Sequence, residues 1–334
     1  MSNAALDPIE TPADPTRLAR YRRVGLLFGV VAAVIWGGFL TVSRHGIGEG
    51  LRGSDLAFLR YATAGLLLLP VLLRRSPSTL GGIGWRRGAG LALLAGPLFV
   101  LIGASGYLYA PLAHGAVIQL GVLTLASIAL SAWLLGERLR PMRLLGLVVL
   151  VAGLATIAGP AIFSGGSRAW IGDLMFATAG AMFATFTVLV RRWKIAALDA
   201  TVAVSVLSAV AYSPLYLLFE GTARLASASP SMLIEQVLVQ GVLSGIVALF
   251  AFAQAVHRLG AGRAALFPAL APAVAILLGI PLVGELPAAG QWLGLAIVTA
   301  GLLVALRTPA QASSSPLPAA TAGGVVATSP RSLS

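Results

Sequence analysis

The sequence predicts an all-α integral membrane protein with ten transmembrane helices, arranged as two inverted five-helix repeats with both termini in the cytoplasm. The chain is 58% hydrophobic and only 10% charged over 334 residues, which leaves too few charges for the surface of a soluble protein of that size. Its apolar residues form ten continuous stretches, each close to the roughly 20 residues that a helix needs to cross the hydrocarbon core. One phrase of glycines and leucines also occurs twice with identical spacing.

In chain order, the sequence predicts a disordered tail over residues 1–22, a first repeat over 23–160, a second over 161–307 and a second disordered tail over 308–334. The apolar stretches are continuous rather than alternating, which favours helices over strands. The expected spans are 24–43, 54–73, 88–107, 113–135, 142–160, 171–190, 200–219, 237–256, 264–284 and 290–306.

The distribution of basic residues predicts the orientation. Most of the 23 lysines and arginines lie in the loops that share a side with the N-terminus, and cytoplasmic loops carry such an excess. The net charge of +12 is therefore explained as a topology signal, and no nucleic-acid partner is expected. We expect a lipid bilayer and a small-molecule substrate as partners and a multi-pass location in the bacterial inner membrane. The sequence leaves the oligomeric state open, and a monomer is plausible.

The repeated phrase indicates a duplicated unit. It reads Gly136-Glu137 followed by Leu-Gly-Leu at 145–147 and Ala-Gly-Leu at 152–154, and it returns 148 residues later from Gly284-Glu285. Each half holds five spans, an odd number, so the second half must enter the membrane in the opposite direction. The arginines after the first copy are missing after the second, as expected if the copies face opposite sides. Inverted repeats are typical of carriers that work by alternating access around a site near the midplane.

Several motifs resemble the drug/metabolite transporter superfamily, in its ten-helix branch with two EamA-type repeats. They are Trp36-Gly37, Phe58-Leu59-Arg60 and the glycine–glutamate phrase that closes each half. Over residues 24–306 the chain resembles bacterial amino-acid exporters of the inner membrane. The resemblance implies a central cavity lined largely by spans 1, 3, 4, 6, 8 and 9. One position departs from the family pattern: Pro272 precedes the second Gly-Glu, but Thr124 is its equivalent in the first copy, which leaves the kink of the fourth span open.

Polar and aromatic side chains deep in apolar spans are candidates for a solute site, because such side chains are costly in lipid. The glutamines at 119 and 254 either line a cavity or form interhelical hydrogen bonds. The histidine at 114 could bind a carboxylate, carry a proton or cap a helix. The tryptophan at 36 is too deep for an interfacial anchor and forms either core or a flat wall. We hypothesise that the substrate-binding residues are Trp36, Tyr107, His114, Gln119 and Gln254.

Other polar residues are expected to have structural roles. Arg60 should reach the membrane interface or pair with Asp55 or Glu49. Asp173, Glu220 and Arg224 are expected at the interface. Hydroxyl side chains commonly mediate helix packing, and this interpretation is preferred for Ser127, Ser131, Thr185, Ser205, Ser208 and Ser244.

The expected function is export of small neutral or zwitterionic metabolites, with amino acids, aromatic ones included, as the leading class. No carboxylate falls at mid-depth of a predicted span, so gradient-driven facilitation is preferred over proton coupling. The alternative is a multidrug or lipophilic-cation exporter that holds cations on aromatic rings. A passive channel is a third possibility. The sequence shows no catalytic triad, His-Glu-x-x-His motif or glycine-rich nucleotide loop, so we expect no enzyme, metal or cofactor.

Overall fold

The computed structural model describes residues 15–136, 141–163, 168–259, 264 and 267–306, and in these residues every regular element is helical. The first half of the chain forms α1 (Pro15–Gly48), α2 (Gly53–Arg74), η1 (Pro77–Thr79), α3 (Trp85–Ala95), α4 (Pro97–Ser105), η2 (Gly106–Leu108), α5 (Leu112–His114), η3 (Gly115–Gln119), α6 (Leu120–Leu135) and α7 (Pro141–Phe163). The second half forms α8 (Ala169–Arg192), α9 (Ala197–Phe219), α10 (Ala223–Ser227), α11 (Pro230–Gln236), η4 (Val237–Val247), α12 (Ala248–Leu259), η5 (Pro268–Leu270), α14 (Ala271–Val283) and α15 (Ala289–Leu306).

The all-helical membrane class is confirmed. Among the described residues, seven helices or runs of joined helices are long and apolar enough to cross a membrane: Ala19–Gly48, Gly53–Arg74, Trp85–Leu108, Leu112–Leu135, Ala169–Arg192, Ala197–Phe219 and Pro230–Leu259. Two shorter apolar helices, Leu144–Ile157 and Ala271–Val283, accompany them. The number of ten spans and the location of the termini stay predictions.

Part of the predicted N-terminal tail is helical in the structure. Residues 15–22, predicted to be part of the N-terminal tail, belong to α1 because the helix begins at Pro15. A proline is well tolerated in the first turn of a helix, where its missing N–H needs no partner. The other tail residues, 1–14 and 307–334, lie outside the described residues, as do residues 137–140, which include Glu137.

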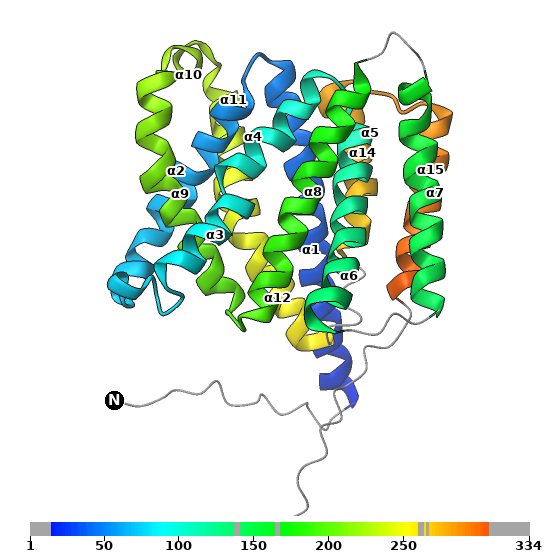
Figure 1. Cartoon of the computed structure of the whole chain (residues 1–334), viewed down its shortest axis with the longest axis horizontal. Helices are drawn as coiled ribbons and strands as arrows, with labels where there is room; N and C mark the ends of the chain where they lie inside the picture. Colours follow the sequence, from blue (N-terminus) through cyan, green and yellow to red (C-terminus); the bar gives the residue numbers. More distant parts are fainter. Residues whose placement is uncertain (1–14, 137–140, 164–167, 260–263, 265–266, 307–334) are drawn as a thin grey trace, which may run out of the picture.

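Figure 1 shows α1 in the middle of the bundle, with α2 and α9 towards one edge and α7 beside α15 at the other. The largest cluster of buried apolar side chains joins α1, α2, α4, α8 and α9 and includes Leu56, Tyr107, Phe176 and Tyr216. A second cluster, which includes Val117, Leu150 and Val298, connects α7 and α15 to this body. Residues of the two halves are thus mixed throughout the core.

The repeated phrase has a physical role at two places. Gly136 and Gly284 both end their helices in the left-handed conformation, with φ of 68° and 71°, where a side chain would be strained. The other glycines bring α7 and α15 together. A Cβ atom on Gly153 would lie 3.1 Å from Gly294 O, and one on Gly301 would lie 2.9 Å from Gly146 O.

These two close approaches are the same contact made twice, because 148 residues separate 153 from 301 and 146 from 294. Along α7 the residue number rises from one contact to the other, while along α15 it falls. The two equivalent helices therefore run in opposite directions and meet around a local two-fold axis. This is the relation that an inverted repeat requires of a helix and its copy.

The fourth span has a π-helical segment and no proline at position 124. Its segment η3 is π-helical, with the wider turn that places one extra residue between hydrogen-bonded backbone groups. The Thr124 hydroxyl, at the position equivalent to Pro272, donates to Leu120 O at 2.9 Å. Pro272 lies in the first turn of α14, whereas its equivalent Thr124 lies inside α6, after the π-helical η3.

Candidate functional site

A narrow pocket lies inside the bundle between α1, α4, η2 and η3. We call it the central pocket, and its lining residues are Phe39, Leu40, Ser43, Phe99, Val100, Gly103, Ala104, Tyr107 and Gln119. Its volume of about 10 Å³ is no more than the space that one water molecule needs. The chain is therefore closed around this pocket, and a larger solute would require the surrounding helices to move.

Helical spacing explains which side chains of α1 face the pocket. Ser43 follows Phe39 by four residues and Leu40 by three, so all three side chains lie on one side of the helix. Trp36 precedes them by one turn on the same side, and its ring packs against Phe252 of α12 with 5.2 Å between centroids. The face of α1 that holds the pocket therefore continues towards the N-terminal end of the helix as an aromatic surface.

The opposite wall brings α4 against η3. An added Cβ on Gly103 of α4 would lie 3.4 Å from Gln119 Oε1, an ordinary contact distance. Gln119 is only 7% exposed. Gln119 comes from the π-helical η3, so the wide turn is what carries this amide to the pocket. Such turns occur often at functional sites.

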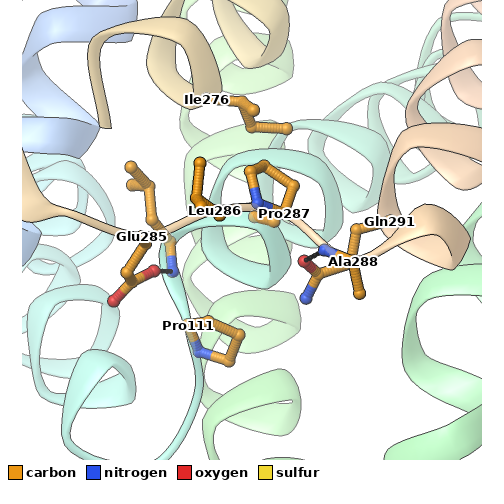
Figure 2. Close-up of a pocket in the computed structure, with 9 residues that line it drawn as sticks. Pro111, Ile276, Glu285, Leu286, Pro287, Ala288 and Gln291 are labelled. Carbon is orange, nitrogen blue, oxygen red and sulfur yellow. Dashed lines mark hydrogen bonds between the residues drawn. The ribbon is translucent and has the colours of Figure 1, made fainter. Parts of the chain in front are cut away.

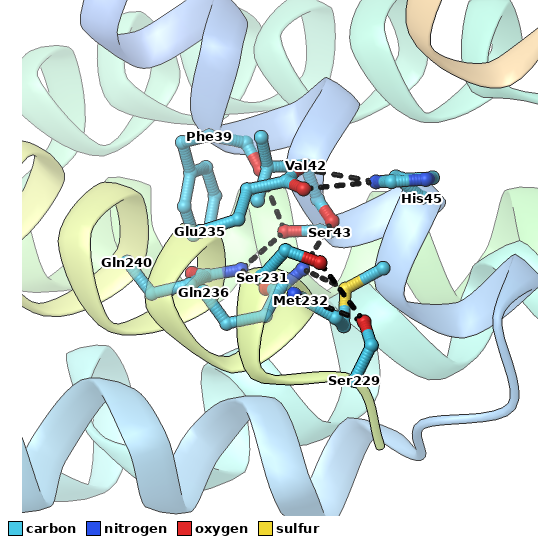
Figure 3. A network of polar contacts seen from close by, with 10 residues as sticks. All are labelled: Phe39, Val42, Ser43, His45, Ser229, Ser231, Met232, Glu235, Gln236 and Gln240. Carbon is cyan, nitrogen blue, oxygen red and sulfur yellow. Dashed lines mark hydrogen bonds and ion pairs between the residues drawn. The ribbon is translucent and has the colours of Figure 1, made fainter.

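A polar network joins the pocket wall to the second half of the chain (Figure 3). Ser43 Oγ donates to Phe39 O at 2.7 Å and accepts from Gln240 Nε2 at 2.9 Å. Gln236 Nε2 donates to Val42 O at 2.9 Å, and both glutamines are fully buried. The two hydrogen bonds that Gln236 and Gln240 donate cross from α11 and η4 to α1, so the network ties the two halves together beside the pocket.

Two buried oxygens at this place have no hydrogen-bond partner among the described residues. One is the Tyr107 hydroxyl on the pocket wall, and the other is Gln240 Oε1 behind it. A buried polar atom without a partner is costly and calls for an explanation, of which an absent ligand is one. Aromatic rings of α8 pack against the same wall. The ring centroids of Phe176 and Tyr107 are 4.9 Å apart, and those of Phe183 and Phe99 are 5.2 Å apart.

Arg60 lies next to this network and corrects the sequence-based expectation. It donates to Ser244 Oγ at 2.8 Å and to Gln240 O at 3.4 Å. Its guanidinium carbon lies 4.9 Å from the centre of the Phe39 ring, a cation–π distance. The side chain therefore turns into the bundle and pairs with neither predicted carboxylate, and Ser244 contacts a charge instead of only packing.

Asp55, the predicted partner of Arg60, has other partners at the start of α2. It is fully buried and accepts from Arg224 Nε at 2.8 Å and from the Arg52 backbone N–H at 2.7 Å. The Tyr216 hydroxyl also donates to it. Glu220 accepts from the same Arg224, so these residues form one ion-pair cluster at the end of the bundle.

A larger cavity of about 410 Å³, the end cavity, opens where α14 ends and α5 begins (Figure 2). Its wall includes Glu285, which accepts from Arg44 Nε at 2.5 Å and from the Leu112 backbone N–H at 2.7 Å. Arg44 also donates to Tyr107 O at 3.2 Å. These contacts link α1, η2 and α5 to the segment that follows α14, with Tyr107 on the central pocket and Glu285 on the end cavity.

His114 forms a buried pair instead of opening into the central pocket. Its Nδ1 lies 2.7 Å from Asp173 Oδ1, and the two side chains are 8% and 10% exposed. Asp173 is thus buried between helices, whereas the sequence led us to expect it at the interface. Its Oδ2 has no partner among the described residues.

The structure brings together two of the predicted site residues, Tyr107 and Gln119, in the central pocket. Trp36 lies on the same face of α1, while His114 is in the buried pair with Asp173. Gln254 is half-buried in α12 and is not a lining residue. Sequence reasoning missed Phe39, Ser43, Phe99, Gln236 and Gln240. The two glutamines had a signal, since amides four residues apart in an apolar stretch point to one buried helix face.

Comparison of the chain with known protein families identifies its family. Residues 23–159 and residues 170–307 each match the model of the EamA-like transporter family. The chain belongs to this family. The family resemblance found in the sequence is thereby confirmed, and the chain is a membrane transporter of the drug/metabolite type that carries the family domain twice. The narrower likeness to amino-acid exporters stays a prediction.

A solved structure described as "Crystal structure of protein" is 21% identical to this member of the family. The match covers 84% of this chain and 96% of the other, with a TM-score of 0.58. At that identity the likeness concerns the fold alone. No curated protein matches the chain. Within the described residues, no group of three or more His, Cys, Asp and Glu side chains is arranged to hold a metal ion.

Proposed function

We propose that the protein exports small neutral or zwitterionic metabolites across the bacterial inner membrane, with amino acids as the main class. In this proposal ten helices span the membrane, both termini lie in the cytoplasm, and the solute passes through the central pocket by alternating access. Flux follows the solute gradient. The observation that carries the proposal is the lining of the central pocket, which combines aromatic rings with uncharged polar groups.

None of the nine lining residues of the central pocket is charged. Phe39 and Phe99 offer flat apolar surfaces, and Tyr107, Gln119 and Ser43 offer hydrogen bonds that a polar solute can use. A site for cations would gain from a carboxylate on its wall, which this pocket lacks. The lining therefore favours an uncharged or zwitterionic solute over a lipophilic cation.

The closed state of the pocket supports alternating access. The cross-link of Arg44 with Glu285 seals the end of the bundle beside Tyr107, and a pocket of about 10 Å³ has no room for an amino acid. In the proposed orientation this end faces the outside. The antiparallel pairing of α7 with α15 relates the two halves by a local two-fold axis, and rocking about such an axis exposes a central site to each side in turn.

Uptake of radiolabelled amino acids into proteoliposomes tests the proposal. Saturable flux with counterflow, unchanged by an imposed pH gradient, is the expected result. Gln119→Leu should abolish this flux because it removes a polar group from the pocket wall, while Gln291→Leu, at the rim of the end cavity, is the matched control. Gln254→Leu tests the remaining predicted glutamine.

Three results would overturn the proposal. Full amino-acid flux in Gln119→Leu would remove the central pocket from the pathway. Passage of a lipophilic cation without amino-acid flux would establish the drug-exporter alternative. Flux that does not saturate and shows no counterflow would indicate a channel.

A further inference from the structure

We propose that Arg60 binds the carboxylate group of the transported solute. The proposal rests on the proposed function, since it names the chemical group by which that same site selects its substrate. It adds a charged residue to a pocket whose lining is otherwise uncharged. The class of solute is then narrower than neutral metabolites: compounds with a free carboxylate, such as zwitterionic amino acids.

The first argument is the missing counter-charge. Arg60 lies seven residues after Gly53, about 10 Å along α2 from its start. Within the described part of the chain the other carboxylates that form ion pairs have different partners: Asp55, Asp173, Asp199, Glu220, Glu235 and Glu285. Glu49 is exposed beyond the end of α1. A cation inside a membrane bundle is costly without an anion nearby, and such residues mark solute pathways.

The second argument is position. Two separate links connect the guanidinium to the central pocket. It lies over the ring of Phe39, and Phe39 lines the pocket. It also donates to Gln240 O, and the amide of Gln240 donates to Ser43, another lining residue. The guanidinium therefore lies behind the Phe39 wall of the pocket, and the proposal requires this ring to move aside when the solute binds.

The third argument is the unused hydrogen-bonding capacity. Both hydrogen bonds of Arg60, to Ser244 Oγ and to Gln240 O, come from the same terminal nitrogen. The edge formed by Nε and the second terminal nitrogen is not committed to these bonds, and it is the edge that binds a carboxylate in a bidentate manner. Gln240 Oε1 is a buried acceptor without a donor and could meet the ammonium group of the same solute.

The backbone of η4 explains how the cation is held without an anion. This segment is π-helical over Val237–Val247, and it supplies both Ser244 Oγ and Gln240 O. A carbonyl oxygen has two lone pairs, so Gln240 O can accept from a neighbouring helix in addition to its bond within η4. Arg60 is therefore kept in place by neutral oxygens that a carboxylate can supplement. A purely structural link between α2 and η4 would use the same two bonds, so the experiment must separate the two roles.

Two solutes that differ in the carboxylate can separate the binding role of Arg60 from a structural one. Phenylalanine and phenylalaninamide have the same side chain and ammonium group, and only the first carries a carboxylate. We would measure saturable uptake of both into proteoliposomes by wild type, Arg60→Gln and Arg60→Lys, with Arg52→Gln as the matched control because the side chain of Arg52 is 64% exposed. A second measurement on the wild type alone is the thermal stabilisation of the purified protein by each compound.

Wild type and Arg52→Gln should prefer phenylalanine by about tenfold to a hundredfold, the value of a hydrogen-bonded charge pair. In Arg60→Gln the ratio should fall to about one, and Arg60→Lys should retain part of it. Phenylalanine should stabilise the wild type at about tenfold to hundredfold lower concentration than phenylalaninamide. The inference is overturned if wild type shows no preference, or if Arg60→Gln lowers both fluxes equally with the ratio intact, which is the mark of a structural link.

These outcomes differ from failure of the proposed function. If wild type transports and binds neither compound nor any other amino acid, the proposed function itself is wrong and the role of Arg60 falls with it. If wild type transports amino acids but the ratio of phenylalanine to phenylalaninamide uptake does not change in Arg60→Gln, only the present inference fails. Should Arg60→Gln not fold, equal stabilisation of the wild type by both compounds would still overturn it.

Discussion

Replacing Arg224 by methionine removes the cation that neutralises Asp55, and the structure allows the cost to be worked out. Asp55 is 0% exposed, and it keeps only the hydrogen bonds from the Arg52 backbone and Tyr216 after the change. Breaking a buried ion pair costs about 3–5 kcal/mol because one charge stays behind. Since the Arg224 side chain is 25% exposed, we expect the lower end, about 3 kcal/mol of the free energy of unfolding.

The assay is equilibrium unfolding in mixed micelles, followed by the fluorescence of the six tryptophans. The double variant Asp55→Asn/Arg224→Met removes the stranded charge, so it should recover at least about 1 kcal/mol relative to Arg224→Met. Methionine keeps much of the length and apolar character of the arginine stem, which limits the loss of packing. A loss below about 0.5 kcal/mol for Arg224→Met, or no recovery in the double variant, would refute the reasoning.

Three further predictions follow from single contacts. Gly301→Leu should lower the free energy of unfolding by about 1–3 kcal/mol, because its Cβ would lie 2.6 Å from a backbone nitrogen of α7, whereas Gly290→Leu enters open space. Glu285→Ala should loosen the closed end, so that Ser43→Cys in this otherwise cysteine-free chain reacts faster with an impermeant thiol reagent added outside. The hydrogen bond from Arg224 lowers the pKa of Glu220, so Glu220→Gln should remove a stability contribution that is present above pH 4.5 and lost as the pH falls through that lowered pKa.

Each of these has a contrary outcome. Equal stability of both glycine variants would mean that α7 and α15 separate easily. Unchanged labelling of the cysteine would show that the cross-link at Glu285 does not control access to the central pocket. For Glu220, the stability of wild type and variant between pH 3 and pH 7 should converge at the acid end, and parallel curves would contradict the sign of the effect.

Some residues of the central pocket could be predicted from the sequence and others could not. Tyr107 and Gln119 were found because polar groups in an apolar span are costly and therefore informative. Phe39 and Phe99 could not be found, since an aromatic residue in a span is most often lipid-facing or core. From the sequence, Ser43 would be interpreted as a serine that mediates helix packing. Its hydrogen bond with Gln240, which is 197 residues away in the chain, is seen only in the structure.

The sequence by itself determined the all-helical membrane class, the family and the duplicated unit. These depend on apolar length and on spacing along the chain, which the bilayer thickness and the helix geometry translate directly into structure. The glycine phrase also predicted local structure, because glycine adopts the left-handed caps without strain and permits the close approach of α7 to α15.

Only the tertiary structure decided which charges meet. Arg60 was expected to reach the interface or to pair with Asp55 or Glu49. Instead, Asp55 pairs with Arg224, and Arg60 donates to Ser244 and Gln240. Asp173 pairs with His114 across the two halves. Ion pairs and cation–π contacts act over a few ångströms between residues far apart in the chain, and no local periodicity encodes them. The π-helical turns that present Gln119, Gln240 and Ser244 are likewise set by packing, since their sequences read as ordinary apolar helix.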